Sequence, residues 1–452
     1  MRLQPDKNIT NKPILKTLIT VSWPIIFGQI MQLLYILGDT FWIGKLGPDY
    51  LAAISISLPL IFIVISLAAG FSIAGMTLVA QYTGAQLKEK ADLAAGQCLF
   101  ISVLISGFLS GLGLIFGQEL LKLMGVSGET LFHSWEYFQV MMGAIPLFII
   151  FHIFTSILQG IGNSLTPMKT KMVIVTGNII FDPIFIFGWS IFPELGVKGA
   201  AVGTIVAYSA GSIVGLYILS SGKYINIKIT HLKPKWKIIK KILYIGLPAA
   251  LGMSGLAVGM SLMTSIVARF GNITLAAWGI SKRIISFIHI PAVGLSRGTG
   301  ILVGQYLGNN QPKETNKTVF ISSTGTFCLI FIIAIILPYI APFLISIFTN
   351  SVEVIKTGTQ YLKIVGFGYA FFSIHQIFCG ALRGAGKTIE QTVFRFLTLL
   401  ILQIPLSLLF AFYLSWGERG IWWGIFTAKL VGTLIIFIWF IQGKWQNKVI
   451  ED

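Results

Sequence analysis

The stretch LTLLILQIPLSLLFAFYL, at positions 397–414, contains no charged side chain. Similar apolar runs occur at 58–69 and 327–336. The whole chain of 452 residues is 55% hydrophobic and only 11% charged, with a mean hydropathy of +0.83. These runs exceed what one soluble core can bury, and they are continuous rather than alternating. They therefore predict membrane-spanning helices of about 20 residues each.

The pattern predicts an all-α membrane protein with twelve transmembrane helices. The first apolar run begins near Thr17, is too long for a cleaved signal peptide and lacks a small-residue cleavage site, so we expect a retained first helix. The predicted spans are 17–43, 51–82, 92–118, 132–160, 165–190, 197–220, 238–268, 274–306, 317–345, 353–384, 388–414 and 419–442.

The net charge of +17 could suggest a nucleic-acid-binding protein. The distribution of the charge argues against this. The tails and even-numbered loops, with the adjoining helix ends, hold 21 of the 33 Lys and Arg residues, whereas the odd-numbered loops hold six. This bias follows the positive-inside rule. It predicts a multi-pass protein of the cell membrane with both termini in the cytoplasm, surrounded by lipid and without a nucleic-acid partner.

The chain also contains an internal repeat. Residues of the first copy match residues of the second at a constant distance along the sequence, which is the distance from Pro24 to Pro248. ILQGIG at 157–162 matches ALRGAG at 381–386, and QYTG at 81–84 matches QYLG at 305–308. Each copy holds six predicted helices, so both copies have the same orientation in the membrane. Further matching pairs are Gly70 and Gly294, LAA at 51–53 and 275–277, and, after a three-residue slip, Gly196, Gly199 and Gly203 with Gly417, Gly420 and Gly424.

The repeat predicts two pseudo-symmetric six-helix bundles. The N-terminal lobe is expected at 1–220 and the C-terminal lobe at 242–452. A basic cytoplasmic linker at 221–241 joins them and holds seven lysines. Parallel repeats of this kind alternate access by rocking one bundle against the other around a central site.

Two acids, Asp39 and Asp182, lie inside predicted spans, whereas the other 14 of the 16 acids fall in loops, tails or helix ends. An acid in the hydrocarbon region costs several kcal/mol and is expected to face a bundle interior or a water-filled cavity, as an ion or proton site. The repeat does not preserve this pair, because Asp39 aligns with Met263 and Asp182 aligns near Ile404.

The spacing around the acids predicts a cation site. Tyr35 and Asp39 share a helix face, as do Asn178 and Asp182, and Thr204 begins the TIVA segment of the sixth span. Asp39, Asn178, Asp182 and Thr204 offer hard oxygen ligands, which suit Na⁺ or a proton. Two neighbouring carboxylates in a low dielectric do not both ionise easily, so one of them is expected to hold a proton.

Other polar residues inside spans are candidates for weaker roles. Gln32 and Tyr35, on the first helix, and His152 and Thr155, on the fourth, are predicted substrate contacts. Pro24 is a predicted hinge, since proline bends a helix. The sequence leaves open whether Lys282, Arg283 or Arg297 contacts substrate. No cofactor motif and no spacing typical of a catalytic site is evident, so we expect neither enzymatic activity nor a cofactor beyond the coupling ion.

These residues resemble the multidrug and toxic compound extrusion (MATE) transporters over nearly the whole chain. The resemblance lies in YILGDTFWIGKLGP at 35–48, NIIFDPIF at 178–185, GVKGAA at 196–201 and LRGAGKT at 382–388. The pattern is most similar to the prokaryotic DinF-like branch, which implies that acids of the N-terminal lobe carry cation coupling. The NorM-like branch uses acids of the C-terminal lobe, and the seventh span here has none. A fourth-helix asparagine of some relatives is replaced by Thr155.

The resemblance implies a secondary active antiporter that exports organic, cationic or amphipathic compounds in exchange for H⁺ or Na⁺. It is expected to be a monomer. The alternative is a flippase for lipid-linked oligosaccharides or lipids of the same superfamily. Those relatives usually carry extra helices and a strongly basic cleft, so twelve spans favour the antiporter. The sequence does not decide between H⁺ and Na⁺.

Overall fold

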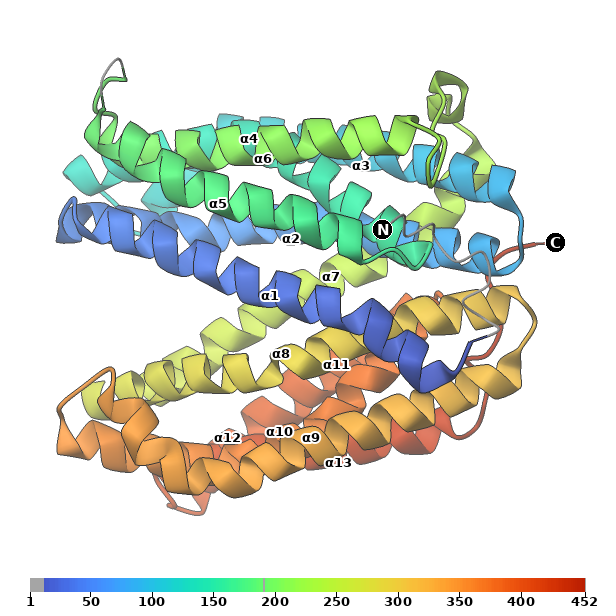
Figure 1. Ribbon diagram of the computed structural model, residues 1–452. Helices are drawn as coiled ribbons and strands as arrows, with labels where there is room; N and C mark the ends of the chain where they lie inside the picture. Colours follow the sequence, from blue (N-terminus) through green and yellow to red (C-terminus); the bar gives the residue numbers. More distant parts are fainter. Residues whose placement is uncertain (1–11, 190–191, 452) are drawn as a thin grey trace. The chain divides into compact units, whose positions relative to one another are not determined.

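The structure is a computed structural model that describes residues 12–189 and 192–451 (Figure 1). Within these residues, twelve helical segments are long and apolar enough to cross a membrane, which confirms the predicted fold class. The elements are α1 Ile14–Gly44, α2 Pro48–Gly84, α3 Lys88–Leu123, α4 Gly128–Gly160, α5 Leu165–Phe187, α6 Gly196–Ser220, η2 Ile229–Leu232, α7 Trp236–Ala268, α8 Asn272–Gly308, α9 Pro312–Ser346, α10 Val352–Gly384, α11 Thr388–Phe396, η3 Leu397–Gln403, α12 Ile404–Leu408, η4 Leu409–Tyr413 and α13 Glu418–Phe440.

Several helices are longer than their apolar cores. α3 has 36 residues, and a helix of that length measures about 54 Å, whereas the hydrocarbon layer is about 30 Å thick. The polar first turn, which begins at Lys88, therefore extends past the apolar part of the span. Hydropathy detects only that apolar part, and this is why the predicted span began at residue 92.

The eleventh span, predicted at 388–414, is helical over Thr388–Tyr413, and the type of helix changes within it. Two π-helical segments, η3 and η4, flank the short α12. Pro405 lies in the first turn of α12 and has no backbone N–H to donate to the preceding turn. The wider π turns shift the register relative to the first repeat. As a result, Ser407 lies against Gly424 in the second copy, just as Asp182 lies against Gly203 in the first. The repeat partner of Asp182 is therefore Ser407 rather than a residue near Ile404.

The turns between helices repeat with the sequence. Gly47 and Gly271 have φ angles of 129° and 93°, and Gly162 and Gly386 have φ angles of 88° and 78°. A side chain is strained in this left-handed region, whereas glycine adopts it readily. The shared glycines therefore fix the same helix-to-helix turns in both copies.

The contacts divide the described chain into two compact units. The first contains Phe27–Ser254, and the second contains Gly255–Glu451 together with the start of α1 up to Ile26. This division differs from the predicted lobes at the first helix of each half. The start of α1 packs with the second unit and the start of α7 packs with the first, because each of them contacts a glycine of a helix in that unit.

These glycine contacts are related by the repeat. A Cβ on Gly70 of α2 would overlap Ala250 of α7, and a Cβ on Gly294 of α8 would overlap Ile26 of α1. Gly70 and Gly294 are repeat partners. The residues that they contact, Ala250 and Ile26, are repeat partners as well. Small residues let helix backbones approach closely in a membrane. The glycines that the sequence marked as shared thus hold α7 against α2 in one unit and α1 against α8 in the other.

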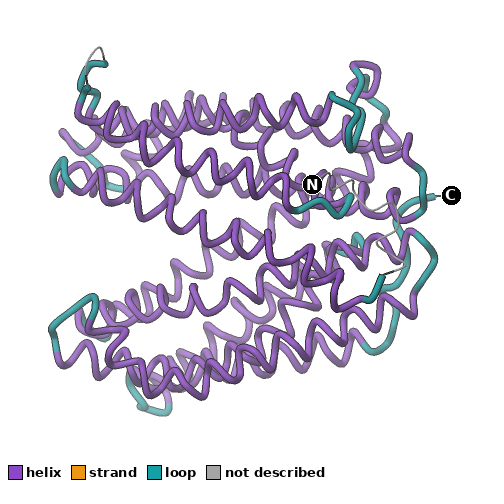
Figure 2. The backbone as a smooth tube through the Cα atoms, viewed as in Figure 1, coloured by secondary structure: helices purple, strands orange, loops and turns teal. Residues whose placement is uncertain are grey.

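The first unit is built from α2 packed on α3 and α4, with α4 also packed on α6, and α5 packed on α6. Figure 2 shows helices joined by loops throughout these elements. In the second unit, α10 contacts α8, α9 and α13. Its core includes a stack of Trp278 on Trp422, with ring centroids 5.9 Å apart, and the ring of Tyr361 set edge-on to Trp422.

Candidate cation site

The acidic site of the first unit begins on α5. Asn178 and Asp182 lie one helical turn apart and are both fully buried. Nδ2 of Asn178 donates hydrogen bonds to Oδ1 of Asp182, at 2.7 Å, and to Oγ1 of Thr204 on α6, at 3.2 Å. The asparagine side chain therefore connects the carboxyl group of its own helix with the hydroxyl group of the next helix.

α1 completes the site. The hydroxyl groups of Tyr35 and Thr204 are hydrogen-bonded at 3.0 Å. The carboxyl groups of Asp39 and Asp182 interact with each other across α1 and α5. An ionised carboxylate only accepts hydrogen bonds, so a hydrogen bond between the two acids requires one of them to carry a proton. The two acids are therefore placed where a single proton between them would remove the repulsion of their charges.

Three buried oxygens of this site have no hydrogen-bond partner among the described residues. They are Oδ1 of Asp39, Oδ2 of Asp182 and Oδ1 of Asn178. Buried polar atoms are nearly always paired, so unpaired oxygens of this kind indicate a missing ligand or water. Carboxylate and amide oxygens are suitable ligands for a hard cation. The unpaired oxygens of the site are thus of the kind that coordinates a small monovalent cation.

A glycine on α6 makes room for the acid. A Cβ on Gly203 would lie 2.5 Å from Oδ1 of Asp182, and a Cβ on Gly199 would overlap the backbone of Phe185. α5 and α6 can approach this closely only because both positions lack a side chain. The glycine pattern that the repeat analysis found thus positions the carboxyl group beside Thr204.

Two tyrosines near the acids were missed by sequence reasoning. Tyr208 on α6 interacts with Gln32, and its ring centroid lies 6.2 Å from that of Tyr35. Tyr137 on α4 is 2% exposed and interacts electrostatically with both acids. Tyr208 follows Thr204 by one helical turn, so a shared helix face could have indicated it. Tyr137 lies near the start of a long aromatic span and gives no such signal.

The predicted residues of α4 lie beside this site. His152 is half-buried, and its Nδ1 lies 2.8 Å from the backbone oxygen of Phe148. Phe148 packs edge-on against Tyr208 with ring centroids 4.5 Å apart. Oγ1 of Thr155 is buried without a hydrogen-bond partner among the described residues. His152 and Thr155 therefore remain predicted substrate contacts, with no direct bond from Thr155 to the acids.

The remaining candidates lie in the second unit. Pro24 is buried inside α1, two positions before Ile26, where the contacts of α1 pass to the first unit. Lys282 is half-buried with its Nζ 5.6 Å from the ring centroid of Trp278, Arg283 is exposed and Arg297 is half-buried.

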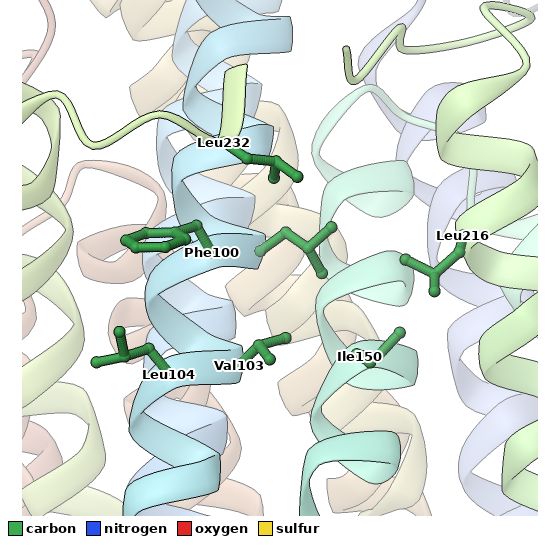
Figure 3. A pocket seen from close by; sticks show the side chains of 7 residues that line it. Phe100, Val103, Leu104, Ile150, Leu216 and Leu232 are labelled. Carbon is green, nitrogen blue, oxygen red and sulfur yellow. The ribbon is translucent and has the colours of Figure 1, made fainter. Parts of the chain in front are cut away.

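The first unit also has an apolar recess of about 420 Å³ between α3, α4, α6 and η2. Figure 3 shows six of its seven lining side chains labelled. The lining residues are Leu99, Phe100, Val103, Leu104, Ile150, Leu216 and Leu232. They offer no polar atom to a cation, so this recess is distinct in chemistry from the acidic site.

Comparisons with known proteins agree with this architecture. A family model described as MatE matches residues 24–184 and 248–409, two segments that begin at the repeat partners Pro24 and Pro248. The probable multidrug resistance protein YpnP of Bacillus subtilis (strain 168) is 26% identical over 441 residues, which cover 97% of each chain. The multidrug export protein MepA of Staphylococcus aureus (strain MRSA252) is 26% identical over 439 residues, which cover 94% of each chain.

The fold also matches solved structures. An outward-facing multidrug resistance MATE family transporter of the MOP superfamily has a TM-score of 0.91 at 24% identity, with 98% of each chain covered. MATE in a bent conformation also has a TM-score of 0.91 at 24% identity, with 97% of each chain covered. With twelve apolar helices in the part of the chain that the structure describes, the protein is a multi-pass membrane protein. Because the family model covers most of both halves, the chain belongs to the MatE family.

Proposed function

We propose that the protein is a secondary active antiporter that exports organic cationic or amphipathic compounds in exchange for H⁺ or Na⁺. The carrying observation is the carboxyl pair of Asp39 and Asp182, with its unpaired buried oxygens. The names of the relatives, a multidrug resistance protein and a multidrug export protein, support the substrate class. The coupling role rests on the pair alone.

The site holds one positive charge in either of two forms. With a proton, the two carboxyl groups bond to each other. With Na⁺, the oxygens of Asp39, Asp182, Asn178 and Thr204 serve as ligands, and the shared proton leaves. Both forms neutralise a buried carboxylate, whose uncompensated charge would cost several kcal/mol. An inward gradient of the bound ion then drives the exchange.

Coupling requires that the cation prefers one conformation over another. α1 is the element that can transmit this preference. Its second part carries Tyr35 and Asp39 in the first unit, whereas its first part packs on α8 in the second unit. Cation binding pulls Asp39 toward α5 and α6, and Pro24 lies where α1 can bend in response. Substrate contacts at Gln32, Tyr35, His152 and Thr155 then change together with the cation site.

The test is transport by purified protein in liposomes under separate proton and sodium gradients. An organic dye cation such as ethidium is the transported probe. Asp39→Asn and Asp182→Asn are expected to lose gradient-driven exchange, because an amide cannot release a proton or replace a carboxylate charge. Glu119→Gln is the matched control, since this acid of the same unit lies on an exposed face and pairs with Lys122. Undiminished, gradient-dependent transport in both aspartate variants contradicts the coupling role.

The separate gradients identify the ion. Exchange that a pH gradient drives without sodium assigns H⁺, and exchange that requires sodium at equal pH on both sides assigns Na⁺. The positive-inside bias further supports cytoplasmic termini in the plasma membrane. A fluorescent-protein fusion at the C-terminus is expected to fluoresce in bacteria, and an alkaline phosphatase fusion is expected to be inactive.

A further inference from the structure

The second unit contains a cation enclosed by aromatic rings. Nζ of Lys429, on α13, lies 4.1 Å from the ring centroid of Tyr369 and 3.9 Å from that of Phe372, both on α10. The lysine is only 5% exposed. Such short contacts place the ammonium group over the faces of both rings. Among the described residues, no acidic side chain pairs with it.

Two histidines share the same rings. His289 of α8 stacks on Phe372 with centroids 5.7 Å apart and meets Tyr369 edge-on at 5.3 Å. Its Nδ1 is buried and has no hydrogen-bond partner within the described part of the chain. His375 stacks on Phe372 from one turn further along α10, at 5.1 Å. Lys429 and His289 therefore present nitrogen atoms without acidic partners around the same two rings.

Arginines add to the positive charge of this region. Arg395 interacts electrostatically with His289 and His375, and its Nη2 lies 3.4 Å from Oε1 of Gln376. Arg383 and Arg297 interact electrostatically with Arg395 as well. We call Lys429, His289, His375 and Arg395, with the rings of Tyr369 and Phe372, the basic aromatic cluster.

The helices of this unit supply no counter-charge in their interiors. Four acids of α8–α13 lie in the first turns of their helices. Glu418 accepts a hydrogen bond from Thr274, and Glu390 lies 3.8 Å from Lys387. The first-turn acids are Glu314, Glu353, Glu390 and Glu418. The basic side chains of the cluster thus have no acidic partner in the interior of these helices.

Comparison of the two repeats shows that Lys429 takes the place of an uncharged aromatic residue of the first unit. Phe372 is the partner of Phe148 at the repeat offset, and Lys429 is the partner of Tyr208 after the three-residue slip. In the first unit, Tyr208 packs on Phe148 with centroids 4.5 Å apart. In the second unit, Lys429 packs on Phe372 in the same relationship. The first unit adds two acids near this contact, and the second unit adds cations.

We propose that the basic aromatic cluster binds the anionic group of an amphipathic organic molecule, with the rings of Tyr369 and Phe372 contacting its apolar part. Buried charge without a partner is strongly unfavourable, and a carboxylate, sulfonate or phosphate would supply the missing charge. Arginine and lysine recognise these groups through charge-assisted hydrogen bonds. This inference rests on the proposed function and extends its substrate class to anions.

The experiment measures equilibrium binding to purified protein in nanodiscs of phosphatidylcholine, without any ion gradient. The probes are 1-pyrenebutyrate, which carries a carboxylate, and 1-pyrenebutanol, which has the same ring system without charge. The wild-type protein is expected to bind the carboxylate more tightly. Lys429→Gln is expected to weaken binding of the carboxylate by about tenfold or more and to leave binding of the alcohol unchanged, since only a charged hydrogen bond is lost.

Two further variants separate the cluster from general effects of substitution. Lys429→Arg keeps the charge and is expected to retain most of the preference for the carboxylate. Lys363→Gln removes an exposed lysine of α10 and is expected to bind both probes as the wild-type protein does. Equal binding of the two probes by the wild-type protein, or an unchanged preference in Lys429→Gln, would overturn the proposal.

A second set of nanodiscs distinguishes the sources of the anion. If phosphatidylglycerol in the nanodisc displaces 1-pyrenebutyrate from the wild-type protein but has no effect on Lys429→Gln, the cluster takes a lipid headgroup. If it does not displace the probe, the cluster takes a free amphipathic anion. Because binding is measured without a gradient, failure here leaves cation-coupled transport through Asp39 and Asp182 intact. Conversely, the aspartate variants can lose transport and still bind the carboxylate probe normally. That result would show that cation coupling and anion binding are independent.

Discussion

Gly203 and Asp182 are in direct contact, and a Cβ on the glycine would lie 2.5 Å from Oδ1 of the acid. Gly203→Ala is therefore expected to displace the carboxyl group and to lower both transport and stability. Forcing atoms into a packed site costs about 1–3 kcal/mol. Thermal unfolding in detergent, together with dye transport in liposomes, measures the two effects.

Gly177→Ala on the neighbouring helix α5 is the control for this substitution. Its Cβ would meet atoms no closer than 3.7 Å, which is an ordinary contact. Alanine also favours the helix by about 1 kcal/mol relative to glycine. Gly177→Ala is therefore expected to be as stable as the parent protein or more so. Equal behaviour of the two variants would mean that Gly203 does not position Asp182.

Asn178→Ala removes the side chain that connects Asp182 with Thr204. The two lost bonds, of 2.7 Å and 3.2 Å, leave buried oxygens without their donor. Such a loss costs about 1–3 kcal/mol. The variant is expected to unfold at lower temperature and to need a higher concentration of the driving ion for half-maximal transport. An ion dependence identical to that of the parent would exclude Asn178 from the cation site.

The hydrogen bond between Tyr35 and Thr204 is suited to a double-mutant cycle. Tyr35→Phe keeps the ring beside Tyr208 and removes only the hydroxyl group, and Thr204→Val removes its partner. Each single variant is expected to lose about 0.5–1.5 kcal/mol of stability. The double variant is expected to lose less than the sum, because the bond of 3.0 Å is removed only once. Strict additivity of the unfolding free energies would show that the contact contributes nothing.

Much of this organisation could be predicted from sequence. The apolar runs predicted the twelve spans because a hydrocarbon layer admits few other backbones. Asp39 and Asp182 could be predicted to lie together because acids inside spans are unfavourable in lipid and face a bundle interior or a water-filled cavity. The repeat identified Gly203 as shared, and the structure adds the physical reason, which is contact between α5 and α6.

Other features depend on three-dimensional packing that hydropathy does not encode. The π-helical turns around Pro405 depend on backbone hydrogen bonds, and they altered the repeat partner of Asp182. The start of α1 packs with the second unit because of Gly294 and Gly298, which contact Ile26 and Ser22. Lys429 carries no such signal in the sequence, because its relation to Phe372 appears only when the helices are packed.

Pro24→Ala tests the predicted hinge. The variant restores a backbone N–H and is expected to stiffen α1, because the interior of a helix disfavours proline by about 3 kcal/mol. Transport is expected to slow while the thermal stability stays equal or rises. Pro59→Ala in α2 is the control, since this proline also lies inside a helix but is exposed. Transport at the parent rate in Pro24→Ala would remove the hinge from the mechanism.

The proton that we propose Asp39 and Asp182 share can be tested directly by infrared spectroscopy of the purified protein. In sodium-free buffer near neutral pH, we expect a carbonyl band of a protonated carboxylic acid that disappears as the pH is raised. That band is expected to be absent from both Asp39→Asn and Asp182→Asn and to persist in Glu119→Gln. A carboxylic acid band that survives unchanged in both aspartate variants, or a wild-type protein without one, would contradict a proton held between these two side chains.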